Sequence, residues 1–281
     1  MYKEGKWASQ IIALQEEDGK WGWFHSLSQF YNSPITTEQA LRRLQILGFT
    51  IEDECIQKAV QYMNDCLIGK KMIPDRREKV HDWDIFTSLI LSTWIRRFTR
   101  GNREADSVAE KWTEVITQGF QTGCYNREEY IYAYQKVLNP SGGRILEPYS
   151  FYQVSIVSDC LDSRTEEAYL DYLIHRETGI YYIYGSRISC LPADFRSRNA
   201  SSYLGAIELL AEYKHSGAHL GFAADWLLNN RKENGMWDMG SAAKDNLYFP
   251  LSDDWRSEKT REFDCTKRVN ELVSKLMRHS Q

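Results

Sequence analysis

Apolar residues recur along most of this chain at spacings of three and four, the pattern of helices with one buried face. In one clear example Thr36 can cap a helix start, apolar side chains from Ala40 to Leu47 form one face, and Gly48 ends the segment. Similar patterns predict helices over residues 4–16, 53–66, 81–95, 103–120, 127–138, 148–157, 165–176, 193–213, 217–230 and 259–278, and a short strand or aromatic loop over 181–185.

The first helix runs into a polar turn that contains Gln15 and closes on Gly19 and Trp21. Glycine adopts positive φ without a Cβ penalty, tryptophan can cover the helix end, and the glutamine amide can bond to backbone groups of the turn. The same spacing returns in the segment 226–237, with Arg231 in place of the glutamine. The chain therefore contains two copies of one local structure.

Weaker copies of this turn end at Tyr125 and Tyr181. The four aromatic residues are separated by multiples of roughly 50 to 56 residues, a period typical of repeated helical units. We therefore expect the chain to consist of copies of one helical hairpin.

The pattern Gln-x-x-x-Gly-x-Trp after an apolar helix resembles the QW repeat of squalene-hopene cyclases, other terpenoid cyclases and protein prenyltransferase β subunits. This resemblance implies an all-α fold, the α/α toroid, in which a double ring of helical hairpins surrounds a central cavity. We expect a single toroid domain over residues 1–281, with about five to six repeats. The motif describes a fold and leaves the reaction open.

Two kinds of helix alternate along the chain. The helices before the Gly-aromatic turns are amphipathic, as expected of an outer layer, whereas those starting near 36, 81, 148, 196 and 259 are more apolar or have polar first turns, as expected of an inner layer. In a ring the inner helices direct their N-termini to one mouth, where the positive helix ends favour an anion.

Composition supports a large folded domain. The chain has 281 residues, of which 42% are hydrophobic and 26% charged, enough for a substantial core. The net charge of −4 argues against a nucleic-acid partner. Nine Trp and seventeen Tyr residues suit either a core or the walls of a ligand cavity.

The six cysteines are scattered without a Cys-x-x-Cys pair, residues 1–6 precede no apolar signal core, and no run approaches the ~18 apolar residues of a membrane span. These features predict a cytoplasmic protein with reduced thiols and no integral membrane segment. The sequence leaves the oligomeric state open.

The candidate functional residues belong mainly to the first turns of the inner helices and the loops before them. The candidate catalytic residues are His81, Asp82, Asp84 and Asp264, and the candidate ligand-binding residues are Glu38, Arg76, Arg77, Tyr149, Tyr152, Arg196, Arg198, Asn199, Trp255 and Arg268. The arginines can receive phosphate or carboxylate, or neutralise neighbouring acids, and the aromatic residues can line a cavity or pack in the core.

The segment 81–84 is the densest of these groups. A carboxyl beside a like charge and a histidine can act as a general acid or base, but aspartate at a helix start is also the usual cap. Asp82-Trp83-Asp84-Ile85 resembles the Asp-x-Asp-Asp motif of class II terpenoid cyclases, which implies an acid that protonates an alkene or epoxide. Here the fourth position is Ile85, and the Asp-Asp-x-x-Asp motif for Mg²⁺-diphosphate is absent.

Asp264-Cys265 resembles part of the zinc site of prenyltransferase β subunits. The two residues are adjacent here and would point about 100° apart on a helix, so a structural cysteine is the other interpretation. No metal is assigned, and because motifs for nucleotides, phosphate loops and a serine elbow are absent, no cofactor is expected.

Three functions fit these observations. The first is a terpenoid cyclase-like or prenyltransferase-like protein that binds or converts a small, isoprenoid or anionic ligand in its central cavity. The second is a carbohydrate-active α/α barrel with paired carboxylates, for example Asp82 or Asp84 with Asp264 or Glu38. The third is a non-catalytic binding or scaffold toroid.

Overall fold

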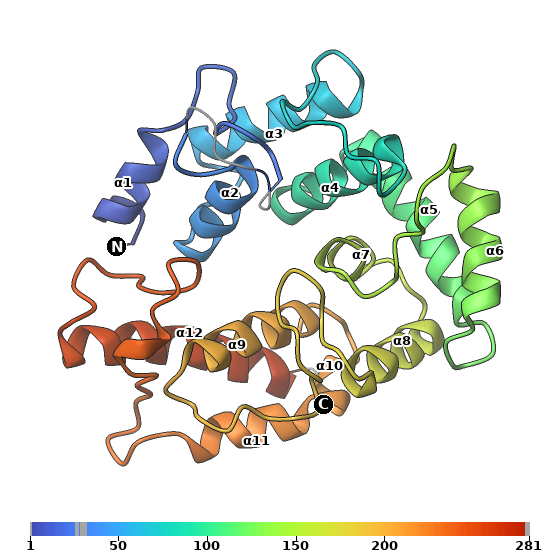
Figure 1. Cartoon of the computed structure of the whole chain (residues 1–281). Helices are drawn as coiled ribbons and strands as arrows, with labels where there is room; N and C mark the ends of the chain where they lie inside the picture. The colour runs from blue at the N-terminus through green and yellow to red at the C-terminus, as the bar shows by residue number, and fades with distance from the viewer. Residues whose placement is uncertain (1, 26–27, 29–32, 279–281) are drawn as a thin grey trace. The chain divides into compact units, whose positions relative to one another are not determined.

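The computed structural model describes residues 2–25, 28 and 33–278, and this part of the chain is all-α, as predicted. Its α-helices are α1 (Lys6–Ile12), α2 (Thr37–Ile46), α3 (Glu54–Leu67), α4 (Trp83–Phe98), α5 (Arg103–Gly119), α6 (Arg127–Leu138), α7 (Phe151–Ile156), α8 (Ser163–His175), α9 (Arg198–Leu210), α10 (Ser216–His219), α11 (Gly221–Asn229) and α12 (Glu258–Arg278) (Figure 1). Two 3-10 helices are η1 (Tyr2–Glu4) and η2 (Ser241–Ala243).

Most predicted helices are confirmed, and the differences have local causes. The ninth helix starts at Arg198 rather than 193, because the Ser197 side chain accepts the Ala200 N–H and caps it there. The helix expected over 217–230 is divided at Leu220 into α10 and α11. Residues 181–185 form a turn with isolated β-bridges rather than a strand.

The chain divides into two compact units, and the boundary falls within α5. Unit 1 comprises Met1–Trp112 and Leu138–Leu146, and unit 2 comprises Thr113–Val137 and Glu147–Gln281. A single toroid over residues 1–281 stays a prediction.

In unit 1, α3 packs along α4, and α1 contacts α2 (Figure 1). Helix α4 is apolar nearly all round, and its second half, from Leu89 to Arg96, is buried. Thr36 caps α2 as predicted, since its side chain accepts the Gln39 N–H and the Gln39 side chain accepts the Thr36 N–H.

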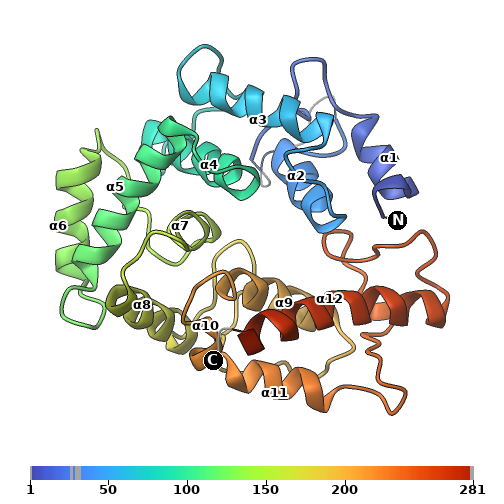
Figure 2. The same cartoon turned by 180° about the vertical axis from the view of Figure 1, so that it is seen from behind.

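In unit 2, α11 lies beside α12, as both views show (Figures 1 and 2). All six residues of α7 are buried, and α7 packs against α9. No helix in residues 2–25, 28 and 33–278 combines the length and the apolar character needed to cross a bilayer. The six cysteines are free thiols.

The first Gly-Trp turn is closed by side-chain hydrogen bonds, as the sequence predicts. The Gln15 amide donates to the Gly19 carbonyl over 2.9 Å, and Gly19 has a φ of +99°. The Trp21 ring is fully buried, and its indole N–H donates to the Ile11 carbonyl over 2.7 Å. The Trp21 backbone N–H donates to the Thr37 hydroxyl oxygen, which joins the turn to α2. The turn thus fixes α1 against the next helix.

The second Gly-Trp turn repeats this scheme with one substitution. Arg231 donates from Nε to the Gly235 carbonyl over 2.8 Å, in the place of the glutamine amide. Gly235 has a φ of +80°, and the Trp237 indole N–H donates to the Leu227 carbonyl over 2.6 Å. The Trp237 backbone N–H donates to the Thr266 hydroxyl oxygen on α12. The same hydrogen-bonded module therefore occurs once in each unit.

The two weaker copies keep only parts of the module. Gly123 has positive φ, but the following Tyr125 hydroxyl points to the Glu147 carboxylate rather than to a helix end. At the other copy, Arg176 donates to the Gly179 carbonyl over 2.7 Å, as Gln15 does to its glycine.

Candidate functional site

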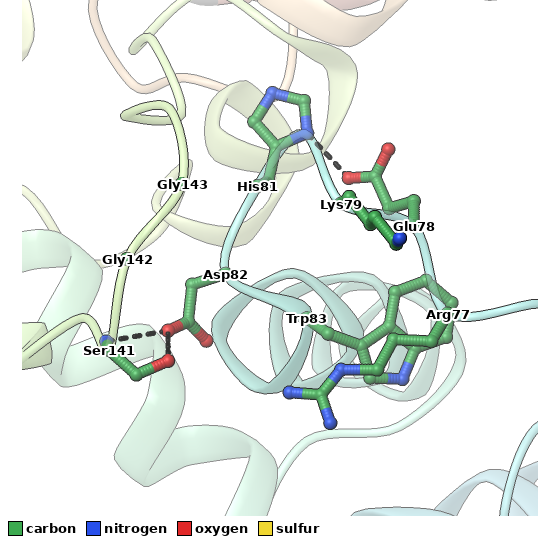
Figure 3. A pocket seen from close by; sticks show the side chains of 9 residues that line it. All are labelled: Arg77, Glu78, Lys79, His81, Asp82, Trp83, Ser141, Gly142 and Gly143. Carbon is green, nitrogen blue, oxygen red and sulfur yellow. Dashed lines mark hydrogen bonds and ion pairs between the residues drawn. The ribbon is translucent and has the colours of Figure 1, made fainter.

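A hollow of about 390 Å³ lies in unit 1 at the start of α4, and we call it the α4 pocket (Figure 3). Two segments line it, 77–83 before and within the first turn of α4 and 141–143 in the loop after α6. Its lining residues are Arg77, Glu78, Lys79, His81, Asp82, Trp83, Ser141, Gly142 and Gly143.

Close backbone packing holds the loop of residues 141–143 against the residues before α4. The Arg144 N–H donates to the Val80 carbonyl over 2.7 Å. Gly143 has a φ of +83°, and a Cβ there would lie 2.7 Å from the Asp82 nitrogen. Only glycine fits this position, whereas a Cβ at Gly142 would meet nothing within 4 Å.

Asp82 joins the two segments of the α4 pocket. Its Oδ1 accepts the Asp84 and Ile85 N–H groups over 3.1 Å each and caps α4, and its Oδ2 accepts the Ser141 N–H and hydroxyl over 2.7 and 2.6 Å (Figure 3). Burial opposes ionisation, but these hydrogen bonds outweigh it and lower the pKa of the Asp82 carboxyl. An ionised structural cap, rather than a proton donor, is the chemistry that this geometry favours.

We expect Asp82→Asn to lower the free energy of unfolding by about 1–2 kcal/mol at pH 7, because the cap and the loop lose a charged acceptor. The folded-state pKa of Asp82 lies below its unfolded value, so its stabilisation exists above that unfolded value of about 4 and is lost as the pH falls through the folded pKa. Urea denaturation between pH 7 and 3 should show the difference between the two proteins shrinking.

The exposed Asp84 provides a matched control, since Asp84→Asn removes the same charge two residues further along the chain. The free energy of unfolding of this control should stay within about 0.5 kcal/mol of that of the unmodified protein at every pH. A pH-independent difference for Asp82→Asn would contradict the assignment of an ionised cap.

His81 and Glu78 form the second polar pair of the α4 pocket. Their Nδ1 and Oε1 atoms lie 2.6 Å apart (Figure 3). The imidazole ring stacks on Phe86 with centroids 6.0 Å apart. A carboxylate at one ring nitrogen orients the imidazole and leaves the other nitrogen for a ligand or water. The His81 side chain is 25% exposed, so a ligand or a water molecule can reach it.

Arg77 and Lys79 supply positive charge to the same pocket. Both are exposed, and within the described part of the chain neither has an ion pair or hydrogen bond from its side chain. Glu78 is already paired with His81, and Asp82 with four donors. Two cations are therefore available to a ligand.

Two further candidates of this region lie outside the pocket lining. Asp84 and Arg76 are both exposed. The structure thus brings His81, Asp82 and Arg77 together but leaves Asp84 and Arg76 outside the lining.

Glu38 and Asp264 are buried acceptors within their own units. The Glu38 carboxylate is 1% exposed and accepts the Trp94 indole N–H over 2.8 Å. The Asp264 carboxylate has no exposed surface and accepts the backbone N–H groups of Leu251 and Ser252 over 3.0 and 2.7 Å. Both carboxylates accept hydrogen bonds from the protein, which a buried acid requires, and therefore have a structural role.

Arg268 and Trp255 also have structural partners in unit 2. Arg268 binds the Glu208 carboxylate through two N–H groups over 2.6 and 2.9 Å and donates to the Ser201 hydroxyl. Trp255 is 6% exposed, and its indole N–H donates to the Ser241 carbonyl. Neither side chain is available to a ligand.

Cys265, the other half of the zinc-like pair, lies in the core of unit 2. Its Sγ accepts the Met239 N–H, and burial raises the pKa of the thiol to about 12. In the described residues no three His, Cys, Asp or Glu side chains are grouped to hold a metal ion.

The remaining candidates of unit 2 are dispersed. Tyr152 is buried in α7, whereas Tyr149 is half-buried with the Arg176 guanidinium 3.4 Å from its ring centroid. Arg198 and Asn199 are exposed at the start of α9, where Arg198 donates to the Lys244 carbonyl. Arg196 lines a different hollow, which lies in unit 2.

Several residues of the α4 pocket have no motif of their own in the sequence. Glu78 and Lys79 belong to a charged run before α4, and the loop residues Ser141 and Gly142 lie far from that run in the chain. The run Asn139-Pro140-Ser141-Gly142-Gly143 predicts a loop, and its glycines allow a close approach to another backbone.

Comparisons of this chain with protein families, with characterised proteins and with solved structures give no match.

Proposed function

We propose that this protein is an α/α toroid of the terpenoid cyclase and prenyltransferase kind, which binds a small anionic ligand in the α4 pocket. The observation that carries the proposal is the pair of exposed cations, Arg77 and Lys79, on the lining of one hollow. Arginine and lysine are the side chains that proteins use to hold phosphate and carboxylate groups.

The two cations without a protein partner among the described residues favour a ligand with more than one negative charge. Of its two carboxylates, Glu78 faces His81, and Asp82 is compensated by four donors and by the positive end of α4. The charges of Arg77 and Lys79 are left to a ligand. A diphosphate group, the head of an isoprenoid diphosphate, has this charge.

The repeated Gly-Trp module supports the toroid part of the proposal. Both copies use a side-chain donor on the glycine carbonyl and an indole N–H on a helix-end carbonyl. A hairpin module of this kind needs neighbours on both sides to bury its faces, and a closed ring supplies them. The isoprenoid part of the proposal rests on the sequence resemblance.

The state of the acids favours binding over acid-initiated cyclisation. Asp82, Asp264 and Glu38 each accept hydrogen bonds from the protein, and the pKa of Asp82 is lowered. An initiating acid needs a protonated carboxyl with a raised pKa near its substrate. The pocket therefore offers two cationic side chains and an imidazole to an anionic ligand, and its described lining contains no strong acid.

The test is calorimetric titration with inorganic diphosphate and with geranyl diphosphate. We expect Arg77→Gln combined with Lys79→Gln to weaken binding of both probes at least tenfold, because two charge-assisted contacts are lost. Tighter binding of geranyl diphosphate than of diphosphate would favour an isoprenoid ligand, and equal binding a site for the anion alone.

A matched double variant removes the same charge elsewhere in unit 1. Arg103 and Lys111 are exposed on α5 and lie outside the pocket lining. Arg103→Gln with Lys111→Gln should bind as the unmodified protein does. An equal loss in both double variants, or no binding of either probe to the unmodified protein, would refute the proposed site.

A further inference from the structure

Unit 2 contains a second hollow, of about 360 Å³, which we call the Arg196 pocket. Three short segments form it, residues 193–196 before α9, residues 230–232 after α11, and Asp238 after the second Gly-Trp turn. Its lining residues are Ala193, Asp194, Phe195, Arg196, Asn230, Lys232 and Asp238.

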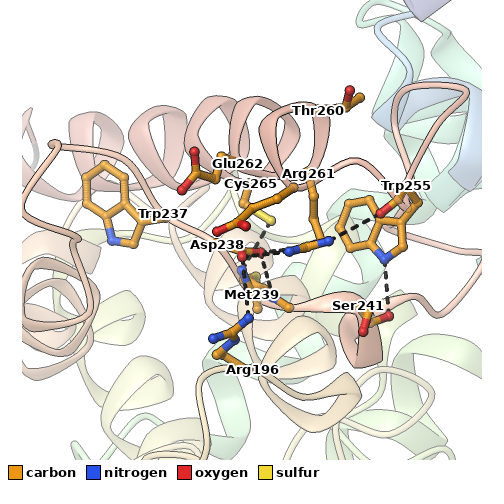
Figure 4. A network of polar contacts seen from close by, with 12 residues as sticks. Arg196, Trp237, Asp238, Met239, Ser241, Trp255, Thr260, Arg261, Glu262 and Cys265 are labelled. Atoms are coloured by element: carbon orange, nitrogen blue, oxygen red, sulfur yellow. Dashed lines mark hydrogen bonds and ion pairs between the residues drawn. The ribbon is translucent and has the colours of Figure 1, made fainter.

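The Asp238 carboxylate of this pocket is already paired with a cation that lies outside the lining, Arg261. Arg261 of α12 donates to its two oxygens over 2.6 and 2.9 Å, and the Gly240 N–H donates over 2.8 Å (Figure 4). Burial opposes ionisation of Asp238, but the Arg261 hydrogen bonds outweigh it and lower the pKa of this carboxyl. The pair Asp238–Arg261 therefore remains charged, and each charge satisfies the other.

Arg196 adds a second positive charge next to the Asp238–Arg261 pair. It approaches Asp238 from a different side than Arg261 does, at 3.5 Å, and its side chain is 63% exposed (Figure 4). The side chain packs on Gly240, where an added Cβ would lie 3.0 Å from the Arg196 Nε. The guanidinium is thus held at the pocket while most of its donors face outward.

The other charges of the lining limit what Arg196 can bind. Lys232 is paired with the carboxylates of Glu258 and Glu262. Asp194 accepts the Arg196 backbone N–H through one oxygen and leaves a negative charge at the pocket. The Arg196 guanidinium beside the Asp194 carboxylate suits a single negative charge, because the carboxylate repels a second one.

Phe195 and Ala193 supply the apolar part of the same pocket. Phe195 is 7% exposed and packs edge-on against Trp226, with ring centroids 5.3 Å apart. Ala193 is exposed and lines the same hollow with a small apolar side chain. The hollow therefore joins a planar guanidinium to a small apolar wall, the usual composition of a small-molecule site.

We propose that the Arg196 pocket is a binding site for a small monocarboxylate with a flat apolar body. The guanidinium of Arg196 holds the carboxylate with two parallel hydrogen bonds, and the body of the ligand lies against Phe195 and Ala193. This site is separate from the α4 pocket, and neither proposal depends on the other.

Nuclear magnetic resonance titration of the full chain with benzoate tests this site. We expect saturable shifts in the unmodified protein and at least a tenfold weaker affinity in Arg196→Gln, with unchanged circular dichroism. Arg187→Gln, which removes an exposed arginine outside the pocket, should bind benzoate normally. Ala193→Trp should abolish binding by filling the hollow while all charges remain.

A titration with inorganic phosphate forms the second arm of the experiment. The monocarboxylate assignment predicts that phosphate binds at least tenfold more weakly than benzoate. Phosphate binding as tightly as benzoate would overturn it, and so would normal benzoate binding to Arg196→Gln or Ala193→Trp, or no saturable shift in the unmodified protein.

Discussion

Trp21→Ala is expected to lower the free energy of unfolding by about 3–5 kcal/mol, the largest effect that we predict for a single substitution. The ring has no exposed surface, and its N–H donates to the Ile11 carbonyl. Removal of the indole leaves a cavity between α1 and the Gly-Trp turn and deprives the helix end of a donor. Urea denaturation followed by circular dichroism measures the change.

Trp7→Ala is the matched control, because Trp7 lies on α1, the helix to which the Trp21 indole bonds, and is only half-buried. We expect less than half the cost of the Trp21 substitution. Similar costs for the two variants would contradict the structural role of the turn, since a generic loss of apolar surface would then explain both.

Gly19→Ala and Gly235→Ala are expected to differ strongly although they alter the same position of the module. Both residues have positive φ, which costs alanine about 1–2 kcal/mol. A Cβ at Gly19 would also lie 2.4 Å from the Lys58 carbonyl oxygen, and this backbone cannot move aside cheaply. At Gly235 the nearest atom is Nη2 of the Arg231 side chain, at 3.2 Å.

We therefore expect Gly19→Ala to cost about 3–4 kcal/mol and Gly235→Ala about 1–2 kcal/mol in urea denaturation. The added cost at Gly19 reflects the close approach of α3 to the turn. Equal costs at the two positions would mean that this approach is looser than the distances indicate.

The local elements of this chain follow from its sequence because the signals are local. Thr36 caps α2, Gly19 takes positive φ, and the tryptophans of both turns bury themselves over the preceding helix. Arg231 could replace the glutamine because the module needs only a donor of suitable length. The ring closure predicted from the resemblance is a long-range property, and no local pattern specifies it.

The candidate site was harder to predict, because the same residue types serve structure and function. Glu38, Asp264 and Arg268 stand in first turns or on polar helix faces like ligand residues, yet each has buried protein partners. Which acid is buried depends on packing between distant segments. His81, Asp82 and Arg77, at and before the start of α4, are the predicted residues that the α4 pocket contains.

The residues around Ser141 are the part of the α4 pocket that the sequence did not predict. They reach Asp82 only through the tertiary structure, and their Asn-Pro-Ser-Gly-Gly sequence predicts a loop without indicating what the loop contacts. Charged residues such as Lys79 likewise gain meaning only from the hollow that they line. A search for glycine-rich loops that accompany charged helix starts would have included both segments.

Titration of inorganic diphosphate into Gly142→Leu tests the α4 pocket most directly. A Cβ at this position meets nothing within 4 Å, so a leucine can enter the hollow without disturbing the backbone, and Gly142→Ala serves as the smaller control. We predict that the alanine variant binds diphosphate and that the leucine variant does not, with thermal unfolding unchanged in both. Diphosphate binding of undiminished affinity to the leucine variant would show that the α4 pocket is not where the anion binds.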